Sequence, residues 1–212
     1  MRLAILGCLG CCIWSVDAFA CAPPIRHAHY DIRHDSYGDI GDHLVTFRCD
    51  DERLVVETEI SIEVNFLIFE LYKRDHRIRE VWQGENLLSF ESDLVEDGER
   101  SQVAARIVED SMVIDAVAGE LEVSPSTISS HPWPQHFINH ELLFSIKTGE
   151  LLQVQIMPAG EDVLNLDAQQ RSVQKFTVSG DLDAELWYDD LGWLQARLPN
   201  DKDGSMITLT RR

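Results

Sequence analysis

The chain has 212 residues, a formal net charge of −19 and a sequence pI near 4.6. Its length favours one domain, whose apolar core is large enough to need no metal or disulfide framework. The excess of acidic residues argues against nucleic-acid binding, which needs clustered Lys and Arg, and against docking on anionic lipid headgroups.

The first twenty residues have the pattern of a signal peptide. Arg2 supplies a positive charge, residues 3–16 form an apolar run, and Ala18-Phe19-Ala20 is a small-x-small cleavage site. The apolar run is too short to span a membrane, and no longer run follows it. We therefore expect an exported protein, periplasmic or extracellular, in which residues 21–212 form a single β-rich domain.

Two cysteines, Cys21 and Cys49, remain after the predicted cleavage. In an oxidising compartment they can form a disulfide, or they can stay separate thiols. Cys21 can instead carry a lipid at the new N-terminus, although the bulky Phe19 beside the cleavage site disfavours lipidation. Sequence alone leaves these alternatives open.

Alternating stretches followed by turns rich in Asp, Glu and Gly recur along the whole chain. The segment "LVVETEISIEV", residues 54–64, places Val56, Thr58, Ile60, Ile62 and Val64 on one face, as expected for a half-buried strand. The other predicted strands are Ala28–His34, His43–Cys49, Tyr72–Trp82, Leu87–Leu94, Ser101–Val108, Met112–Ala116, Leu151–Met157, Ser172–Val178, Asp181–Tyr188, Trp193–Leu198 and Ser205–Thr210. Short connections between successive strands predict an antiparallel meander.

One segment departs from this alternation. Between Pro132 and Lys147, the apolar residues Ile138, Leu142 and Ile146 recur at helical spacing. Pro134 suits the first turn of a helix. We therefore predict a mainly β fold, a curled antiparallel meander (a spiral β-roll or half-barrel) wrapped around one central helix.

Four segments in this order resemble an uncharacterised bacterial family of exported proteins, a domain of unknown function. They are "YDIRHDSYGDIGDHLVTF", "LYKRDHRIREVW", "TGELLQVQIMPAG" and "GDLDAELWYD". The family is distantly similar to exported spiral β-roll proteins, in which a curled antiparallel sheet wraps a helix. The resemblance implies this fold and an exported location, and it implies no activity.

The stretch "YKRDHRIREVW" contains the best candidate site. If it is a strand, Ile78 lies on its aromatic, inward face together with the candidate site residues Tyr72, Arg74, His76, Glu80 and Trp82. Ionisable residues that face inward are unusual unless they are paired. They can form a pocket in which Arg74 and His76 bind an anionic group between Tyr72 and Trp82. Alternatively, the cations of this strand form cross-strand ion pairs with Glu57, Glu59 and Glu63.

Two further groups of polar residues are interpreted as structural. Asp181, Asp183 and Glu185 alternate with apolar residues and are expected to form the solvated side of a strand. His136 and His140 have a spacing that can hold zinc, and His131 lies near them in the sequence. No third ligand is specified, so we interpret these histidines as exposed or hydrogen-bonded. We predict no metal site and no cofactor.

The function expected from these observations is binding in the cell envelope without catalysis. The ligand would be a small amphipathic or anionic molecule held in the concave face of the sheet. A hydrolase acting on envelope carbohydrate or ester substrates is the first alternative, and a structural or protein-interaction module is the second. No nucleic acid and no membrane span are expected, and the protein partner is unknown.

Overall fold

The computed structural model describes residues 21, 23, 25–66, 69–166, 169–200 and 204–212. The predicted signal peptide, residues 1–20, lies outside the described residues. All fifteen described strands belong to one hydrogen-bonded sheet, with the order β8-β7-β6-β5-β4-β3-β2-β1-β15-β14-β13-β12-β11-β10-β9. Every neighbouring pair is antiparallel except β9 and β10, which are parallel.

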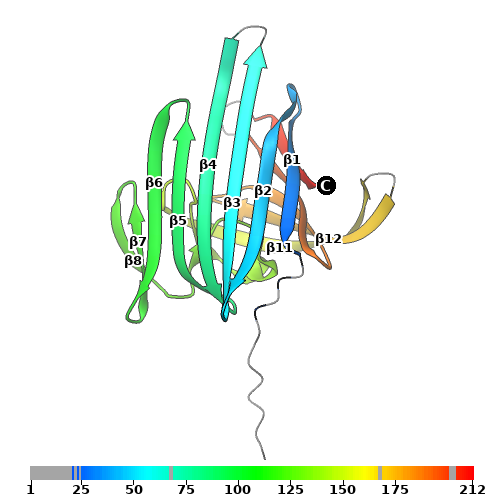
Figure 1. Ribbon diagram of the computed structural model, residues 1–212. Helices are drawn as coiled ribbons and strands as arrows, with labels where there is room; N and C mark the ends of the chain where they lie inside the picture. The colour runs from blue at the N-terminus through cyan, green and yellow to red at the C-terminus, as the bar shows by residue number, and fades with distance from the viewer. Residues whose placement is uncertain (1–20, 22, 24, 67–68, 167–168, 201–203) are drawn as a thin grey trace, which may run out of the picture.

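The first half of the chain forms eight consecutive antiparallel strands (Figure 1). They are β1 (His27–His34), β2 (Gly38–Asp50), β3 (Arg53–Phe66), β4 (Phe69–Gln83), β5 (Asn86–Glu96), β6 (Glu99–Val108), β7 (Ser111–Ala116) and β8 (Gly119–Val123). The second half consists of β9 (Ile128–Ser129), a 3₁₀ helix η1 (Gln135–Asn139), β10 (Leu142–Phe144), β11 (Leu151–Leu166), β12 (Gln169–Gly180), β13 (Ala184–Asp189), β14 (Gly192–Pro199) and β15 (Met206–Arg211).

The last strand of the chain, β15, pairs with the first, β1, in the middle of the sheet. β15 pairs with β1 in the register Tyr30↔Arg211 to His34↔Ile207. Buried Arg211 adds a hydrogen bond from Nη1 to the Trp193 carbonyl oxygen (3.1 Å) and an ion pair with Asp189. This pairing joins the two halves of the chain into one spiral roll.

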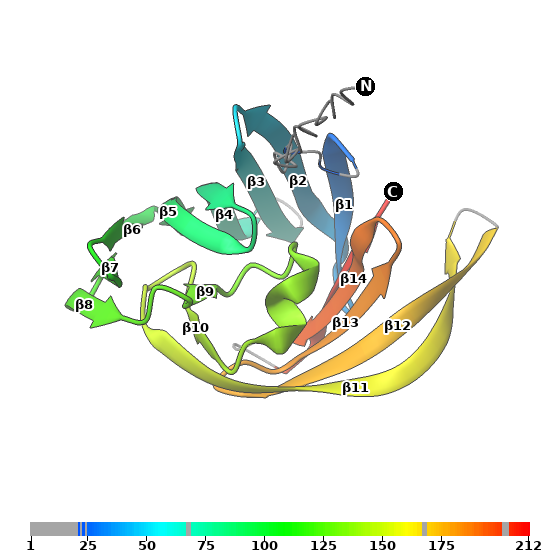
Figure 2. The same cartoon turned by 90° about the horizontal axis from the view of Figure 1, so that it is seen from below.

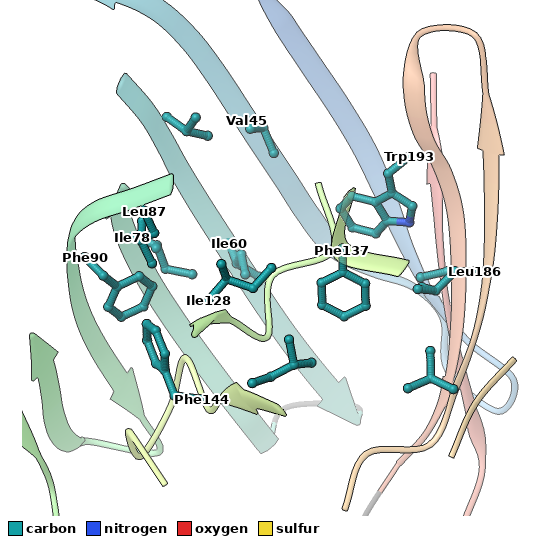
Figure 3. Close-up of a cluster of buried hydrophobic side chains, with 14 of the residues drawn as sticks. Val45, Ile60, Ile78, Leu87, Phe90, Ile128, Phe137, Phe144, Leu186 and Trp193 are labelled. Atoms are coloured by element: carbon teal, nitrogen blue, oxygen red, sulfur yellow. The ribbon is translucent and has the colours of Figure 1, made fainter. Parts of the chain in front are cut away.

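The segment between β8 and β11 lies inside the curl, between β4–β8 on one side and β11–β14 on the other (Figure 2). We call residues 124–150 the inner segment. Its side chains Ile128, Phe137 and Phe144 reach into the core, where Phe144 meets Phe90 of β5 edge-on with ring centroids 5.0 Å apart (Figure 3). The inner segment therefore fills much of the concave side that the sequence led us to expect.

The predicted central helix over Pro132–Lys147 is wrong. The segment contains the five-residue η1, which ends at His140 in an extended conformation, and β10 pairs with both β9 and β11. Ile138, Leu142 and Ile146, which have the spacing of a helix, are only half-buried, whereas Phe137 and Leu143 beside them are buried in an irregular, enclosed chain. Part of its backbone is hydrogen-bonded through the pairing of β10 with β9 and β11 and through bonds such as the Ser130 N–H to the Phe144 carbonyl (2.8 Å).

Two other expectations are adjusted by the described structure. Asp181 and Asp183 precede β13 instead of lying on it, and the Asp181 carboxylate accepts a hydrogen bond from the Gln153 backbone N–H (2.8 Å). Glu185 lies on β13 and pairs with Lys175. Of the alternatives for the cysteines, the structure contains the disulfide between Cys21 and Cys49, with their Cα atoms 5.7 Å apart.

Gly149 allows the inner segment to approach the outer sheet closely. Its φ is +76°, and a Cβ atom there would lie 2.7 Å from the Ala116 Cβ at the end of β7. The adjacent Thr148 carbonyl accepts a hydrogen bond from the Val117 N–H (3.0 Å). The inner segment is thus fixed against the β7–β8 turn at this position.

We expect the Gly149→Ala substitution to lower the free energy of unfolding by about 2 kcal/mol more than Gly98→Ala does. Gly98 also has a positive φ (+85°), but nothing lies within 4 Å of its missing Cβ. Both variants carry the left-handed backbone penalty of about 1–2 kcal/mol, and overpacking adds about 1–3 kcal/mol at Gly149 alone. Urea unfolding measures the difference, and equal losses would contradict the close approach.

Candidate functional site

Polar side chains, all buried except the half-buried Trp133, gather where the inner segment meets the concave face of the sheet. We call this group the polar seam, and it consists of His43, His76, Glu80, Ser92, Ser129, His131 and Trp133. The strands β2, β4 and β5 contribute four of these residues, and the inner segment contributes three. The seam therefore connects the outer and inner turns of the spiral.

Glu80 is the centre of the polar seam, and none of its side chain is exposed. Its Oε1 accepts a hydrogen bond from the Ser129 hydroxyl (2.6 Å), and its Oε2 accepts one from the Trp133 indole N–H. His131 Nδ1 faces the same Oε2 at 3.6 Å. A buried carboxylate is tolerated when its oxygens are satisfied in this way.

His131 and His43 continue the seam away from Glu80. Their Nε2 atoms are 3.3 Å apart, so one nitrogen donates to the other. Burial, and then the neighbouring His131, hold the pKa of His43 well below its usual range, so His43 is neutral.

His76 has its tautomer fixed by its partners. The Ser92 hydroxyl donates to the Ile146 carbonyl (2.7 Å), so His76 Nε2–H must donate to the Ser92 oxygen (2.7 Å). Nδ1 is then the acceptor for the Arg74 guanidinium at 2.8 Å. Burial, reinforced by the positive charge of Arg74, lowers the pKa of His76 to about 3.

The end of the polar seam nearest the start of β4 is its upper end. It is surrounded by Tyr72, Arg74, Glu96 and Lys147. The Tyr72 hydroxyl donates to Glu96 Oε1 (2.5 Å), and Lys147 Nζ lies 3.4 Å from Glu96 Oε2. Burial and the Glu96 hydrogen bond raise the pKa of the Tyr72 phenol. Tyr72 and Arg74 are half-buried, so this end of the seam reaches the surface.

The structure divides the five predicted site residues into three places. Tyr72, Arg74 and His76 lie together at the upper end, whereas Glu80 is bonded to the inner segment. Trp82 is 1% exposed and meets the Trp133 ring edge-on with centroids 5.3 Å apart. Because it is eight residues from Arg74 on an extended strand, Trp82 lies roughly 26 Å away and cannot line the same small pocket.

Sequence reasoning missed the partners of these residues. Ser129 and Trp133 were not associated with Glu80, because these contacts join positions about fifty residues apart through an irregular segment. His43 is connected to Glu80 through His131 of the same segment. The available signal was an acidic residue on the apolar face of a strand, which requires a buried partner somewhere in the fold. That signal predicts a partner without identifying it.

The alternative of cross-strand ion pairs applies to the opposite face of β4. Glu57, Glu59 and Glu63 stand across from Arg79, Arg77 and Lys73 in the register. The Arg79–Glu57 pair is the one formed, with Nε and Oε1 3.8 Å apart. Arg74 and His76 are on the other face, so these glutamates do not neutralise them.

The described part of the chain contains no arrangement of side chains suited to binding a metal ion. No group of three or more His, Cys, Asp or Glu side chains is placed there to hold a metal ion. The His136 and His140 rings lie 5.8 Å apart, and burial lowers the pKa of both. Among the same residues, no helix is long and apolar enough to cross a membrane.

A family model for a domain of unknown function, DUF6134, matches residues 30–212. The chain belongs to this family. A crystal structure titled as a beta-barrel-like protein of domain of unknown function DUF1849 from Brucella abortus is similar to it, with a TM-score of 0.62 and 10% sequence identity. The alignment covers 88% of this chain and 95% of that chain. A search among curated proteins found no match.

These comparisons confirm the resemblance to an uncharacterised family. At 10% identity, the DUF1849 structure shows the fold of this DUF6134 member and nothing about its activity. The predicted antiparallel, mainly β class is confirmed, and the central helix is not part of it.

We expect His76→Gln to reduce the acid sensitivity of the fold. An unfolded histidine binds a proton below about pH 6.5, whereas folded His76 does so near pH 3. His76 therefore lowers the free energy of unfolding by about 1.4 kcal/mol per pH unit between those values as the pH falls. Gln can donate to Ser92 and accept from Arg74, so the variant should lose this slope. Denaturant unfolding at pH 6 and pH 5 measures it.

His27→Gln is the control, because His27 is exposed on the same sheet. Its slope should equal that of the unmodified protein. If His76→Gln also keeps the full slope, His76 is not buried in its neutral form.

We expect Glu80→Gln to lower the free energy of unfolding by about 1–3 kcal/mol, because an amide NH₂ would face at least one N–H or O–H donor of the inner segment. Glu91→Gln, an exposed change on β5, should shift it by less than about 0.5 kcal/mol. Thermal and urea unfolding provide the comparison. Equal stability of the two variants would show that the seam does not hold the inner segment.

Proposed function

We propose that this protein is an exported, non-enzymatic binding module of the cell envelope. Its ligand is a small amphipathic anion held at the upper end of the polar seam, on the concave side of the sheet. The observation that carries the proposal is the half-buried guanidinium of Arg74, which donates to a neutral histidine and whose buried Nε has no hydrogen-bond partner among the described residues.

The charge of Arg74 is incompletely compensated. Its Nη2 donates to the neutral His76, and its buried Nε has no hydrogen-bond partner among the described residues. Glu96 is its cross-strand neighbour on β5, but its charge is shared: against the effect of burial, the Tyr72 hydrogen bond and the charges of Lys147 and Arg74 together lower the pKa of Glu96. The two Glu96 oxygens face Tyr72 and Lys147, not Arg74. An arginine with unused donors in a partly dry position favours a carboxylate, sulfate or phosphate group.

The surroundings of Arg74 favour a ligand that also has an apolar part. The β3–β4 hairpin projects beyond its neighbours, because β2 pairs with β3 only as far as Ile62 and β5 ends at Glu96 beside Arg74 (Figure 1). Phe69 and Leu71, near the tip, are 62% and 50% exposed. An anionic group at Arg74 would thus have an apolar surface above it.

Export is supported by the signal-peptide pattern and by the Cys21–Cys49 disulfide, which requires an oxidising compartment to persist. A disulfide also occupies the Cys21 sulfur that lipidation would need. Both arguments favour a periplasmic or extracellular location.

The hydrolase alternative receives less support from the geometry. A catalytic His76 or Glu80 would need access to substrate, but both are buried and their polar atoms contact groups of the protein itself. The lowered pKa of His76 follows from burial and from Arg74, which is also the pattern of a structural histidine. The interaction-module alternative would use the free edge of β8, whose exposed Glu120 and Glu122 discourage strand addition.

Isothermal titration with dodecanoate below its critical micelle concentration tests the proposal. The unmodified protein should bind it saturably, and Arg74→Gln should weaken binding about 10- to 100-fold through loss of a charge-assisted hydrogen bond. Dodecyl maltoside, which has a similar chain and no charge, should not bind at this position.

Arg77→Gln is the matched control, since Arg77 is exposed on the opposite face of the same strand. It should bind dodecanoate as the unmodified protein does. Absence of saturable binding, or equal binding by Arg74→Gln and the unmodified protein, would refute this site.

A further inference from the structure

A hollow of about 500 Å³ opens on the convex side of the sheet, away from the polar seam. It lies where the β2–β3 and β4–β5 turns meet, at the lower end of these strands in Figure 1. Its size is within the range of about 300–1,000 Å³ that small-molecule sites occupy. Val55, Val81 and Leu88 form an apolar floor, and Asp50, Arg53 and Arg79 stand at the rim.

The floor of the hollow is apolar, although it lies on the convex face of the sheet. Val55 is 2% exposed, yet it belongs to neither of the two apolar clusters inside the protein. A β-bulge between Val81 and Trp82 leaves Leu88 as an extra residue between Leu87 and Ser89 in the ladder with β5. Bulges redirect side chains in this way, and Leu88 is thereby added to the hollow.

Arginines collect around this floor in a strongly acidic protein. Arg53 and Arg79 line the hollow, Arg48 stands across from Val55, and Arg106 stands across from Ser89. Glu57 is shared between Arg48 (3.4 Å) and Arg79 (3.8 Å), so one carboxylate serves two arginines. No ion pair to Arg53 or Arg106 is formed within the described ranges.

We infer that this hollow is a second binding site, one that takes a compact organic carboxylate. The apolar floor of Val55, Val81 and Leu88 accepts the aromatic or aliphatic body. Arg53 and Arg79 on the rim bind the carboxylate, for which the planar guanidinium is suited. Asp50 and the shallow opening disfavour large or multiply charged anions, because part of the rim is acidic and the site is open to solvent.

This site does not depend on the one proposed at Arg74. The two arginine groups lie on opposite faces of the sheet: Arg79 points outward, and Arg74 points inward with His76. Each site can therefore be tested while the other remains intact.

The test uses 2-naphthoate as the probe and methyl NMR of the valine and leucine side chains as the readout. We expect saturable shifts of the Val55, Val81 and Leu88 methyl signals, with a dissociation constant of about 1 mM for a ligand of this size. The uncharged 2-naphthylmethanol should shift these signals at least tenfold less at equal concentration.

Arg53→Gln combined with Arg79→Gln should weaken the binding of 2-naphthoate at least tenfold. Arg100→Gln is the control, because Arg100 is an exposed arginine of β6 that pairs with Asp93, away from the hollow. Arg74→Gln should leave these methyl shifts unchanged even if it abolishes the binding of dodecanoate.

Two results would overturn the inference. The first is an absence of saturable shifts at Val55, Val81 and Leu88. The second is equal binding of 2-naphthoate by the double variant and by Arg100→Gln, which would show that the shifts do not require the rim arginines.

Discussion

The buried carboxylate of Glu80 is the constraint on which the arrangement of the roll depends. A carboxylate on the concave face of β4 cannot remain there without donors, since an unpaired buried charge costs several kcal/mol. The donors come from Ser129 and Trp133, which belong to a segment about fifty residues later. The inner segment is therefore held to the sheet by directed polar contacts as well as by Phe137 and Phe144.

This constraint also explains the neutral histidines. His43 and His76 accompany Glu80 on the concave face, and burial keeps both uncharged. His76 has a defined donor and a defined acceptor nitrogen, and its partner Ser92 bonds the Ile146 carbonyl, so the network favours one position of the inner segment. Apolar contacts are less selective, because they tolerate sliding.

The strands could be predicted because their alternation is local. Residues 54–64 and 72–82 have period two, and each face can be assigned without knowing the fold. The inner segment could not be predicted, because its apolar residues have the spacing of a helix and its polar partners are distant. Local pattern does not distinguish a short helix from an enclosed irregular chain whose backbone is paired with β11. Tertiary contacts decide between them.

The candidate site was predicted in part for the same reason. The inward direction of Arg74, His76 and Glu80 followed from the strand pattern. Their separation, with Arg74 and His76 at the upper end of the polar seam and Glu80 at its centre, depends on Ser92, Ser129 and Trp133. The hollow at Arg53 and Arg79 could not be predicted, since it results from a bulge and from the meeting of two turns. The alternation of residues 72–82 gives no indication of either.

The pairing of β1 with β15 has a consequence for how the chain matures. Asp31 and Arg212 are bonded across a separation of 181 residues, so the edge of β1 has no strand beside it until almost all of the chain has been made. Such distant closure is slow, and an open edge during the delay invites pairing with other chains. A chain of this design is therefore most prone to aggregation during the interval before β15 reaches β1.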